Sequence, residues 1–330
     1  MILTVTLNPG IDKMLIVDNF KLNNDYRVKE VILSAGGKGI NVSRVIKLLG
    51  GKTLVYTIVG GYAAKFFETE LKREKINAKF TYIKKGVTRT NTTIIDVSKK
   101  KITRLLEKGP VLLQNDIIKI KQTLTALIQK TKIEYAVLSG TLPQGVDEYF
   151  YSDIIDIMNK KNIKVVLDTS GLPLQLAIKN KPYIIKPNLS EAEELLNIKL
   201  KNLSELKDAV NFLLKCGIKI VCITCGNKGV IVGVQKELLD KYKSVTTNKK
   251  ENIFFAQPPE IEIKNNVGSG DAFLGGFIFS LSKKENIESA IKTGVSAGIS
   301  NTLSYKPGYI DKKNISFFYS KIKVKELCIE

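Results

Sequence analysis

The chain alternates short apolar runs with amphipathic segments in which apolar residues recur at every third or fourth position. Runs such as "ILTVTL" at residues 2–7 and "TLVYTIV" at 53–59 are rich in β-branched residues and have the length of buried strands. The segment 38–49 has a helical pattern, and a glycine pair ends it. Its apolar face consists of Val42, Val45, Ile46 and Leu49.

The same alternation continues through the later chain, where "EYAVLSG", "IKVVLD" and "YIIKPN" each precede a segment with helical spacing. Strands that alternate with helices in this way are joined by crossover connections, which place helices over both faces of a sheet. We therefore predict the α/β fold class, with three α/β/α layers and a mostly parallel central sheet.

Two stretches, at about 12–34 and 86–107, interrupt this alternation. The second contains two strand-like runs joined at the lysine-rich turn "SKKK", and it reads as a hairpin that no helix follows. We predict that the two stretches form a small accessory sheet over the main one. No linker composition divides the chain, so we expect a single domain that spans residues 1–330.

The 330 residues include no histidine. Ser/His/Asp triads, Cys/His dyads and histidine-ligated metals are therefore excluded, and a general base must come from another residue type. Cys222 and Cys225 lie in an apolar run, and no second cysteine pair completes a zinc site. The N-terminal segment lacks a signal-peptide pattern and no apolar run reaches membrane-spanning length, so we expect a cytoplasmic protein without a membrane partner.

The formal net charge of +20 raises the alternative of a nucleic-acid-binding protein. The lysines, however, occur as scattered pairs near the ends of segments, such as Lys84-Lys85 and Lys160-Lys161, and they form no stripe along one element. A solvated basic surface explains this distribution better, and its positive field would also attract small anionic substrates. We expect no nucleic-acid partner.

The segment "NNVGSGDAFLGGFIFSL" at 265–281 places two glycines, a serine and a carboxylate before an apolar helical run. The first N–H groups of a helix lack intrahelical partners and can bind an anion, and Gly268 and Gly270 would let the anion approach the backbone closely. Asp271 falls in the predicted first turn. From these residues alone, a flexible turn followed by a helix-starting acid is an equally good interpretation.

Polar residues follow several predicted strands. In parallel sheets, ligands bind beyond the carboxyl ends of the strands, so these residues are candidates for one common site. They are Asn8, Pro9 and Asp12 after the first strand, Ser139, Gly140 and Thr141 after "AVL", Asp168 after "VVL", and Lys186, Asn188 and Glu191 after "YII".

A second glycine-rich segment, "SAGGKGINVSR" at 34–44, also opens a predicted helix. Its spacing departs from that of a dinucleotide fingerprint, and a phosphate or sugar cradle fits better, because Lys38 adds a positive charge where bare backbone can come close. Asn41 can hydrogen-bond a hydroxyl. Arg89, on the predicted hairpin, is either a bidentate phosphate clamp or an exposed strand arginine.

Six segments in chain order resemble the signatures of the phosphofructokinase B family of ribokinase-like sugar kinases, from Met1 to about Ile310. They are "TLNPGID", "GGKGIN", "SGTLPQG", "KPNLSE", "CGNKG" and "VGSGDAFLGG". Within the family, the chain is most similar to the branch of 1-phosphofructokinases and tagatose-6-phosphate kinases, with which "LEKGP" at 106–110 also agrees. The resemblance implies a ribokinase-like fold whose accessory sheet acts as a lid.

The resemblance implies a role for each candidate residue. Asp271 matches the general base that takes a proton from the sugar hydroxyl, and the N–H groups of Gly268, Ser269 and Gly270 match the anion hole for the transferred phosphoryl group. Asp12 matches the aspartate that holds sugar hydroxyls, assisted by Gly37 and Asn41. The positions that match those facing a sugar phosphate are Lys38, Arg27, Arg89 and Ser139.

On the nucleotide side, Lys186 and Asn188 match residues at the ATP phosphates, and Glu191 matches the residue that helps to place Mg²⁺ through water. Thr224, Gly226 and Gly229 match the nucleotide loop, although Cys225 stands where a leucine is common. Asp168 and Ser170 are interpreted as structural. ATP and Mg²⁺ are the implied cofactors, and a homodimer through the lid is the implied assembly.

The expected reaction is transfer of the γ-phosphoryl group of ATP to the free primary hydroxyl of a ketohexose monophosphate. Lys38 and Arg89 favour an acceptor that already carries a phosphate, because an unphosphorylated sugar would leave those cations without a partner. Fructose 1-phosphate is the first choice and tagatose 6-phosphate the second. The alternatives are a nucleoside kinase and a non-catalytic protein that binds nucleic acid or senses a sugar phosphate.

Overall fold

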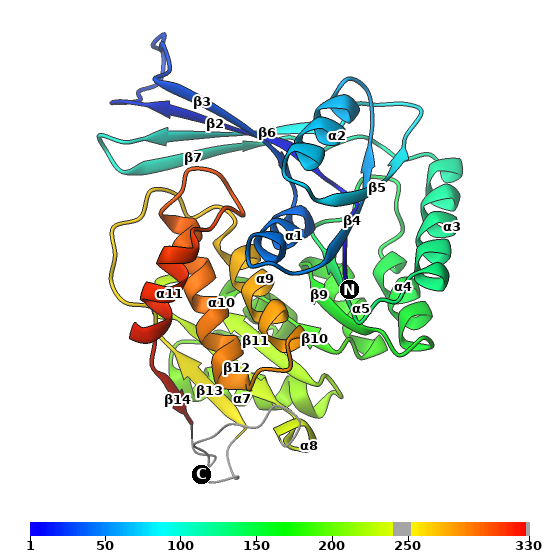
Figure 1. Cartoon of the computed structure of the whole chain (residues 1–330), viewed down its shortest axis with the longest axis vertical. Helices are drawn as coiled ribbons and strands as arrows, with labels where there is room; N and C mark the ends of the chain where they lie inside the picture. The colour runs from blue at the N-terminus through cyan, green and yellow to red at the C-terminus, as the bar shows by residue number, and fades with distance from the viewer. Residues whose placement is uncertain (240–251, 328–330) are drawn as a thin grey trace.

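The computed structural model describes residues 1–239 and 252–327, which fold around a ten-stranded sheet (Figure 1). Seven neighbouring strands run parallel, in the order β5 (Asn77–Tyr82), β4 (Thr53–Val59), β1 (Ile2–Thr6), β8 (Tyr135–Ser139), β9 (Lys164–Asp168), β10 (Ile184–Ile185) and β11 (Ile220–Thr224). The order then continues antiparallel through β12 (Val230–Val234), β13 (Ile253–Ala256) and β14 (Val324–Glu326).

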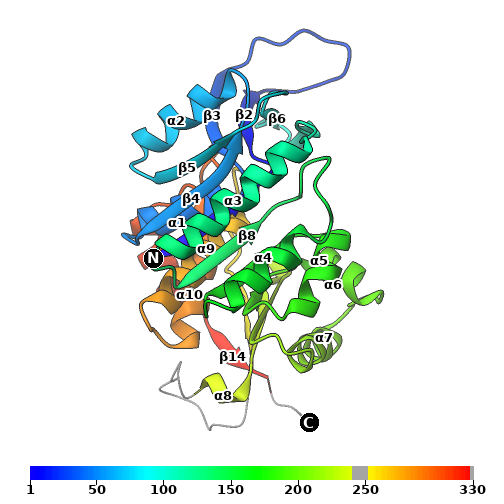
Figure 2. The ribbon, with the colours of Figure 1, turned by 90° about the vertical axis from the view of Figure 1, so that its right-hand side faces the viewer.

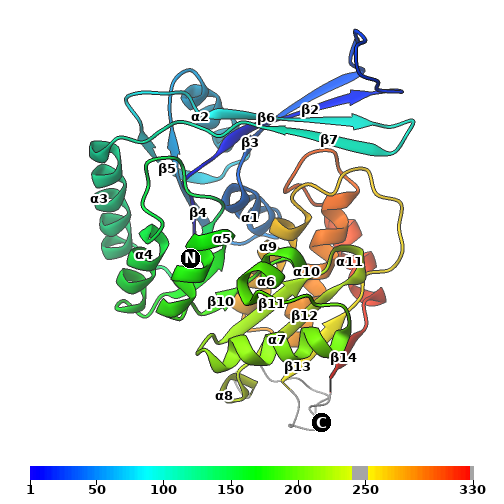
Figure 3. The ribbon, with the colours of Figure 1, turned by 180° about the vertical axis from the view of Figure 1, so that it is seen from behind.

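Helices cover both faces of this sheet, which confirms the predicted three layers. One face carries α1 (Lys38–Leu48), α9 (Ser269–Ser282) and α10 (Ile287–Thr302), with α11 (Lys312–Lys321) beside α10 (Figure 1). The other carries α3 (Gln114–Lys130), α4 (Phe150–Asn159), α5 (Gly171–Ala177), α6 (Leu189–Leu196) and α7 (Leu203–Lys215) (Figures 2 and 3). The short elements are α8 (Lys236–Leu239), η1 (Ile178–Asn180) and η2 (Gly226–Lys228).

The buried strands contribute alternate side chains to two apolar clusters, one on each face of the sheet. In β8, Tyr135 and Val137 pack toward α9 and α10, whereas Ala136 and Leu138 pack toward the α3–α7 face. All four are fully buried. A strand buried on both faces is apolar at most positions, which explains the nearly continuous apolar runs in the sequence.

The stretches at about 12–34 and 86–107 form the predicted accessory sheet of four strands. Its order is β3 (Glu30–Gly36), β2 (Gly10–Val17), β6 (Arg89–Asp96) and β7 (Lys101–Leu106). Strands β6 and β7 make the predicted antiparallel hairpin, and β2 joins it in parallel with β6. The accessory sheet extends from the end of the main sheet where the parallel strands finish (Figure 1), and α2 (Ala63–Arg73) packs against β3 and β5.

One expectation about this region was wrong. Helix α3 follows the hairpin and begins at Gln114. Its buried residues Ile120, Leu124 and Ile128 recur at every fourth position and pack on the sheet. The sequence therefore contained a helical pattern that the expectation of a hairpin without a following helix left out. Among residues 1–239 and 252–327, none of the helices combines the length and the apolar character that crossing a membrane requires.

Candidate active site

Helix α9 begins at Ser269, directly after Gly268, as the sequence predicted. Gly268 has a φ of 81°, and its backbone packs on Pro307 and Gly308, so a Cβ there would lie 3.1 Å from the amide nitrogen of Gly308. A side chain would therefore meet both backbone strain and a close neighbour. The N–H groups of the first turn point out of the helix and form a site suited to an anion.

Asp271 lies in this first turn and is buried. Nδ2 of Asn41, on α1, donates a hydrogen bond of 2.9 Å to Oδ2 of Asp271. Burial, and next the negative charge of Asp168, raise the pKa of the Asp271 carboxyl to about 6, against the opposing effects of Lys38, Asn41 and Lys186. A carboxyl with this pKa is mostly ionised at pH 7 and accepts a proton readily, as a general base must.

Two lysines converge on the buried carboxylate of Asp168, at the end of β9. Nζ of Lys38 lies 3.1 Å and Nζ of Lys186 lies 3.3 Å from Oδ1 of Asp168. Burial works against the charge of Asp168, but Lys186 and Lys38 outweigh it and hold the pKa of that carboxyl below its usual value. Asp168 therefore keeps two cations together at the rim of the sheet.

Both cations lie close to the start of α9. A Cβ on Gly270 would be 3.5 Å from Nζ of Lys186. Burial alone would lower the pKa of Lys38, but the charges of Asp168, Glu191 and Asp271 outweigh it and raise that pKa. Two charged ammonium groups beside the N-terminus of a helix make a strongly anion-attracting position.

In the segment after β10, Asn188 and Glu191 form a reciprocal cap at the start of α6. Oδ1 of Asn188 accepts from the Glu191 N–H at 2.9 Å, and Oε2 of Glu191 accepts from the Asn188 N–H at 2.8 Å. The other carboxylate oxygen of Glu191 lies 3.7 Å from Nζ of Lys38. The cap thus fixes Glu191 within reach of the lysine pair.

The predicted nucleotide loop follows β11. Thr224 ends that strand and donates its N–H to the Pro187 carbonyl at 3.1 Å, which links this loop to the Lys186 segment. Gly226 and Gly229 flank the turn with φ values of 59° and 110°. A Cβ on Gly229 would lie 2.3 Å from the carbonyl oxygen of Ala256, so only glycine fits there.

The accessory sheet brings a second group of polar residues to the same end of the main sheet. Asp12 on β2 is buried, which raises its pKa, and it accepts a hydrogen bond of 3.2 Å from Asn91 on β6. A Cβ on Gly36 would lie 2.1 Å from Oδ2 of Asp12. The glycine therefore makes room for this carboxylate, and Gly37 continues the turn into α1 with a φ of 133°.

Arg89 lies beside Asp12 but does not extend into solvent. Its guanidinium donates to the backbone carbonyls of Asn8 at 2.8 Å and Glu107 at 2.9 Å. These bonds fix its orientation next to the Asp12 carboxylate, so the exposed-arginine interpretation does not hold. Arg27 is different: it is exposed in the loop between β2 and β3, and the structure does not bring it to these residues by any hydrogen bond or ion pair within the described chain.

Several buried polar atoms at this rim have no hydrogen-bond partner among the described residues. They are Nε of Arg89, Oδ1 of Asn8 and Asn91, Oγ of Ser139 and Oδ2 of Asp168. A buried polar atom without a partner costs about 1–3 kcal/mol, so such atoms rarely gather without a polar ligand to satisfy them. Their positions mark the space between the accessory sheet and the ends of β8 and β9.

Two members of this site were missed in the sequence. Asn91 follows Arg89 by two positions and so shares its strand face, which was a signal that could have identified it. Arg44 is almost fully buried and donates to Oδ1 of Asn41. It closes the quoted glycine-rich segment, but nothing in the sequence distinguishes it from a surface arginine.

The described residues, 1–239 and 252–327, contain no group of three or more His, Cys, Asp or Glu side chains that could hold a metal ion by themselves. A metal bound beside Glu191 would need further ligands, such as phosphate oxygens of a substrate. Mg²⁺ is commonly held in this way, by one or two carboxylates together with substrate phosphates and water.

Comparison with known proteins agrees with this geometry. The model of the "pfkB family carbohydrate kinase" matches residues 6–310. Two curated Staphylococcus epidermidis proteins named tagatose-6-phosphate kinase are 32% identical over 330 residues, which cover 99% of this chain and the whole of each relative.

Solved structures with this fold cover nearly the entire chain. A Thermotoga maritima protein described as a possible 1-phosphofructokinase superposes with a TM-score of 0.86 at 25% identity and covers 99% of both chains. Phosphofructokinase-2 of Escherichia coli in complex with substrates and products gives a TM-score of 0.85 at 24% identity, over 97% of this chain and 98% of that one. The second likeness concerns the fold alone.

Proposed function

The chain belongs to the pfkB family of carbohydrate kinases, and on that premise we propose that it transfers the γ-phosphoryl group of ATP to a ketohexose monophosphate, giving a bisphosphate. The observation that carries the proposal is the buried carboxylate of Asp271 in the first turn of α9, beside an anion site and two lysines. Phosphoryl transfer needs alignment and charge stabilisation more than covalent chemistry, and this arrangement provides both.

Asp271 acts as the general base in this proposal. Its carboxylate takes the proton of the acceptor hydroxyl while the hydroxyl oxygen bonds to the γ-phosphorus, and the bond from that phosphorus to the β–γ bridging oxygen breaks to release ADP. The N–H groups of Gly268, Ser269 and Gly270 receive the negative charge of the transferred group. Nζ of Lys186, next to Gly270, faces the same charge.

On the nucleotide side of this proposal, Lys186, Asn188, Thr224, Gly226 and Gly229 would hold ATP, and Glu191 would help to hold Mg²⁺. A bound Mg²⁺ ion neutralises phosphate charge and orients the triphosphate. Once ATP is bound, Nζ of Lys186 can turn from Oδ1 of Asp168 to phosphate oxygens.

On the acceptor side, Asp12 and Asn91 provide paired polar groups for sugar hydroxyls, with Asn41 and Gly37 nearby. Arg89, Ser139 and Lys38 are proposed to face the phosphate that the acceptor already carries. Ser139 Oγ and Arg89 Nε are buried polar atoms without protein partners in the described chain, which supports a polar ligand between them.

Tagatose 6-phosphate and fructose 1-phosphate both offer a free primary hydroxyl and a phosphate at the other end of the sugar. The relatives that are 32% identical over the whole chain carry the name tagatose-6-phosphate kinase. This likeness reverses the order expected from the sequence motifs. We therefore place tagatose 6-phosphate first and fructose 1-phosphate second.

The outer face of the accessory sheet supports a homodimer through the lid. Leu33, Lys13, Thr92 and Leu105 lie side by side in register across the four strands, on the face opposite Asp12. Leu33 is 43% and Leu105 58% exposed. We propose that two copies pair these faces, and Leu33→Lys with Leu105→Lys should then lower the molar mass measured by light scattering from that of a dimer to that of a monomer.

The function is tested by measuring ADP release with Mg-ATP and a panel of acceptors: tagatose 6-phosphate, fructose 1-phosphate, fructose 6-phosphate and unphosphorylated fructose. We expect the largest kcat/KM with tagatose 6-phosphate, then fructose 1-phosphate, and little turnover of fructose. Preference for unphosphorylated fructose would contradict the proposed acceptor class. Absence of turnover with all four, together with salt-dependent retention on DNA, would favour the binding-protein alternative.

A further inference from the structure

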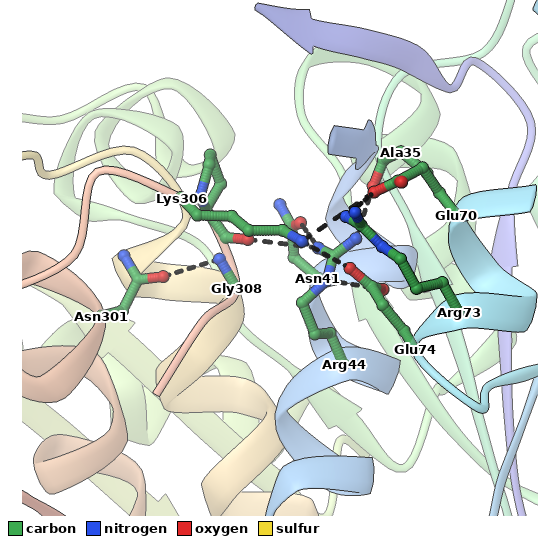
Figure 4. Close-up of polar contacts among 10 residues, drawn as sticks. Ala35, Asn41, Arg44, Glu70, Arg73, Glu74, Asn301, Lys306 and Gly308 are labelled. Carbon is green, nitrogen blue, oxygen red and sulfur yellow. Dashed lines mark hydrogen bonds and ion pairs between the residues drawn. The ribbon is translucent and has the colours of Figure 1, made fainter. Parts of the chain in front are cut away.

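A buried polar network joins four separate chain segments around the start of α9 (Figure 4). Arg44 on α1 is at its centre, and its side chain is only 3% exposed. Its guanidinium donates to Oε2 of Glu74 at 2.9 Å, Oδ1 of Asn41 at 2.8 Å and the carbonyls of Ala35 at 2.7 Å and Pro307 at 3.1 Å. The fork of donors on arginine makes such a fourfold contact, which no other side chain can reproduce.

The contact with Asn41 decides which way its amide points. Because Arg44 donates to Oδ1, that atom must be the carbonyl oxygen, and Nδ2 is left on the opposite side. There Nδ2 donates to Oδ2 of Asp271 at 2.9 Å. Without Arg44, the amide could turn and present its oxygen to the carboxylate, which would replace an attraction by a repulsion.

The contact with Pro307 ties down the chain on the other side of α9. Gly308 follows Pro307 and donates its N–H to Oδ1 of Asn301 at 2.6 Å. Nδ2 of Asn301 donates in turn to the Val267 carbonyl at 2.9 Å, immediately before Gly268. A continuous path of hydrogen bonds therefore runs from the residue before the anion site, through Arg44, to Asp271.

Carboxylates and a lysine hold Arg44 itself in place. Burial works against the charge of Glu74, but Arg44 and Lys306 outweigh it and lower the pKa of that carboxyl. Nζ of Lys306 lies 2.7 Å from Oε1 of Glu74, and Arg73 pairs with neighbouring Glu70 at 2.8 Å. Arg44 thus lies in a cluster of three cations and two carboxylates, between the middle of α1 and the end of α2.

We propose that Arg44 is a positioning residue for phosphoryl transfer, which orients Asn41 toward Asp271 and fixes the segment around Pro307 and Gly308 against the start of α9. The inference rests on the proposed function, since the geometry that Arg44 maintains is that of the base and the anion site. Arg44 acts through Asn41 and the 307–308 backbone and reaches neither substrate.

The orientation of Asn41 also affects how the rate of phosphoryl transfer depends on pH. The charged groups that face Asp271 are Asp168 after β9, Lys38 on α1 and Lys186 after β10, and none of them contacts Arg44. The Asn41 hydrogen bond favours the ionised form of Asp271, so losing it leaves the base protonated to a higher pH. The acid limb of a plot of kcat against pH should therefore move to higher pH when Asn41 no longer donates to Asp271.

The test is Arg44→Lys, which keeps a buried positive charge opposite Glu74 but cannot make four directed contacts. We expect kcat to fall about 10- to 100-fold, as for other positioning groups, with a smaller change in the KM of either substrate. The acid limb of kcat against pH should move upward by up to about one unit. Rates are normalised to the folded fraction measured by circular dichroism.

Two controls separate positioning from stability. Arg73→Lys alters the exposed edge of the same cluster and should leave kcat and the acid limb unchanged. Glu74→Gln removes an anchor of Arg44 and should lower the melting temperature while the acid limb stays in place. The inference is overturned if Arg44→Lys has the kcat and pH profile of the wild type. It is also overturned if Glu74→Gln loses as much kcat as Arg44→Lys. A wild type that phosphorylates no acceptor overturns the proposed function instead.

Discussion

Replacing Asp271 by asparagine should lower activity about 100-fold or more and at the same time stabilise the folded protein. The carboxyl has a pKa of about 6 in the folded state, above its ordinary value of 3.8. Ionising it therefore costs the folded state more than the unfolded state. This penalty is fully present above about pH 6, shrinks between pH 6 and 4, and is absent below the unfolded pKa.

The gain in stability expected for Asp271→Asn follows from the pKa shift of the Asp271 carboxyl. A rise of about two pKa units at a buried group corresponds to about 3 kcal/mol at pH 7.5, and this is an upper bound because unfolded chains retain some structure. The amide oxygen introduced by Asp271→Asn would still accept from Nδ2 of Asn41, without the charge. Such a gain would raise the melting temperature by about 5 °C in a chain of this size.

The assay is urea denaturation of wild type and Asp271→Asn at pH 7.5 and at pH 5, followed by circular dichroism. We expect the variant to be more stable at pH 7.5 and the difference to be smaller at pH 5. Asp153→Asn is the matched control, because Asp153 is half exposed in a surface pair with Lys121 and should change stability by less than about 1 kcal/mol.

Equal or lower stability of Asp271→Asn at pH 7.5 would refute the reasoning, since the charge of Asp271 would then cost the fold nothing. A gain that is the same at pH 5 and 7.5 would also count against it. A stability gain that does not depend on pH would come from packing, and the ionisation of the Asp271 carboxyl would then have no part in it.

Three other substitutions test separate parts of the site. Gly36→Ala should lower kcat/KM for the sugar phosphate about 100-fold, because its Cβ would lie 2.1 Å from Oδ2 of Asp12, while the KM for ATP stays constant in initial-rate kinetics. Gly308→Ala should lower the free energy of unfolding in urea by about 1–3 kcal/mol, since φ is +70° there and the Cβ would lie 2.8 Å from Cα of Asn41. Lys186→Met should reduce kcat by about 100-fold or more and weaken Mg-ATP binding in calorimetry. For each of the three variants, a wild-type value of the quantity measured would contradict the contact from which its prediction is argued.

The layers of the fold were predictable because buried strands and amphipathic helices leave strong periodic patterns. Strand β8 is apolar from Ala136 to Leu138, and α1 shows its apolar face at the expected spacing. The antiparallel edge formed by β12, β13 and β14 was not predicted, because pairing direction depends on contacts between distant segments. Helix α3 was missed although its spacing was visible.

The site was predictable where local sequence and chemistry coincide. The place of Asp271 in the first helical turn followed from the glycine turn before it and the apolar run after it, and the structure confirms this place. Its role as a base followed only from the family resemblance. Arg44 could not be found in this way, since its partners Glu74 and Pro307 lie 30 and 263 positions away. A single sequence does not reveal which arginine is buried in such a network.

The most direct test of the account is the transfer of label from γ-labelled ATP to tagatose 6-phosphate by wild type and Asp271→Asn in parallel. The account predicts one labelled bisphosphate formed for each ADP released by the wild type, and a rate lower by about 100-fold or more in the variant. Transfer by Asp271→Asn at the wild-type rate would contradict the central claim that this carboxylate at the start of α9 is the base.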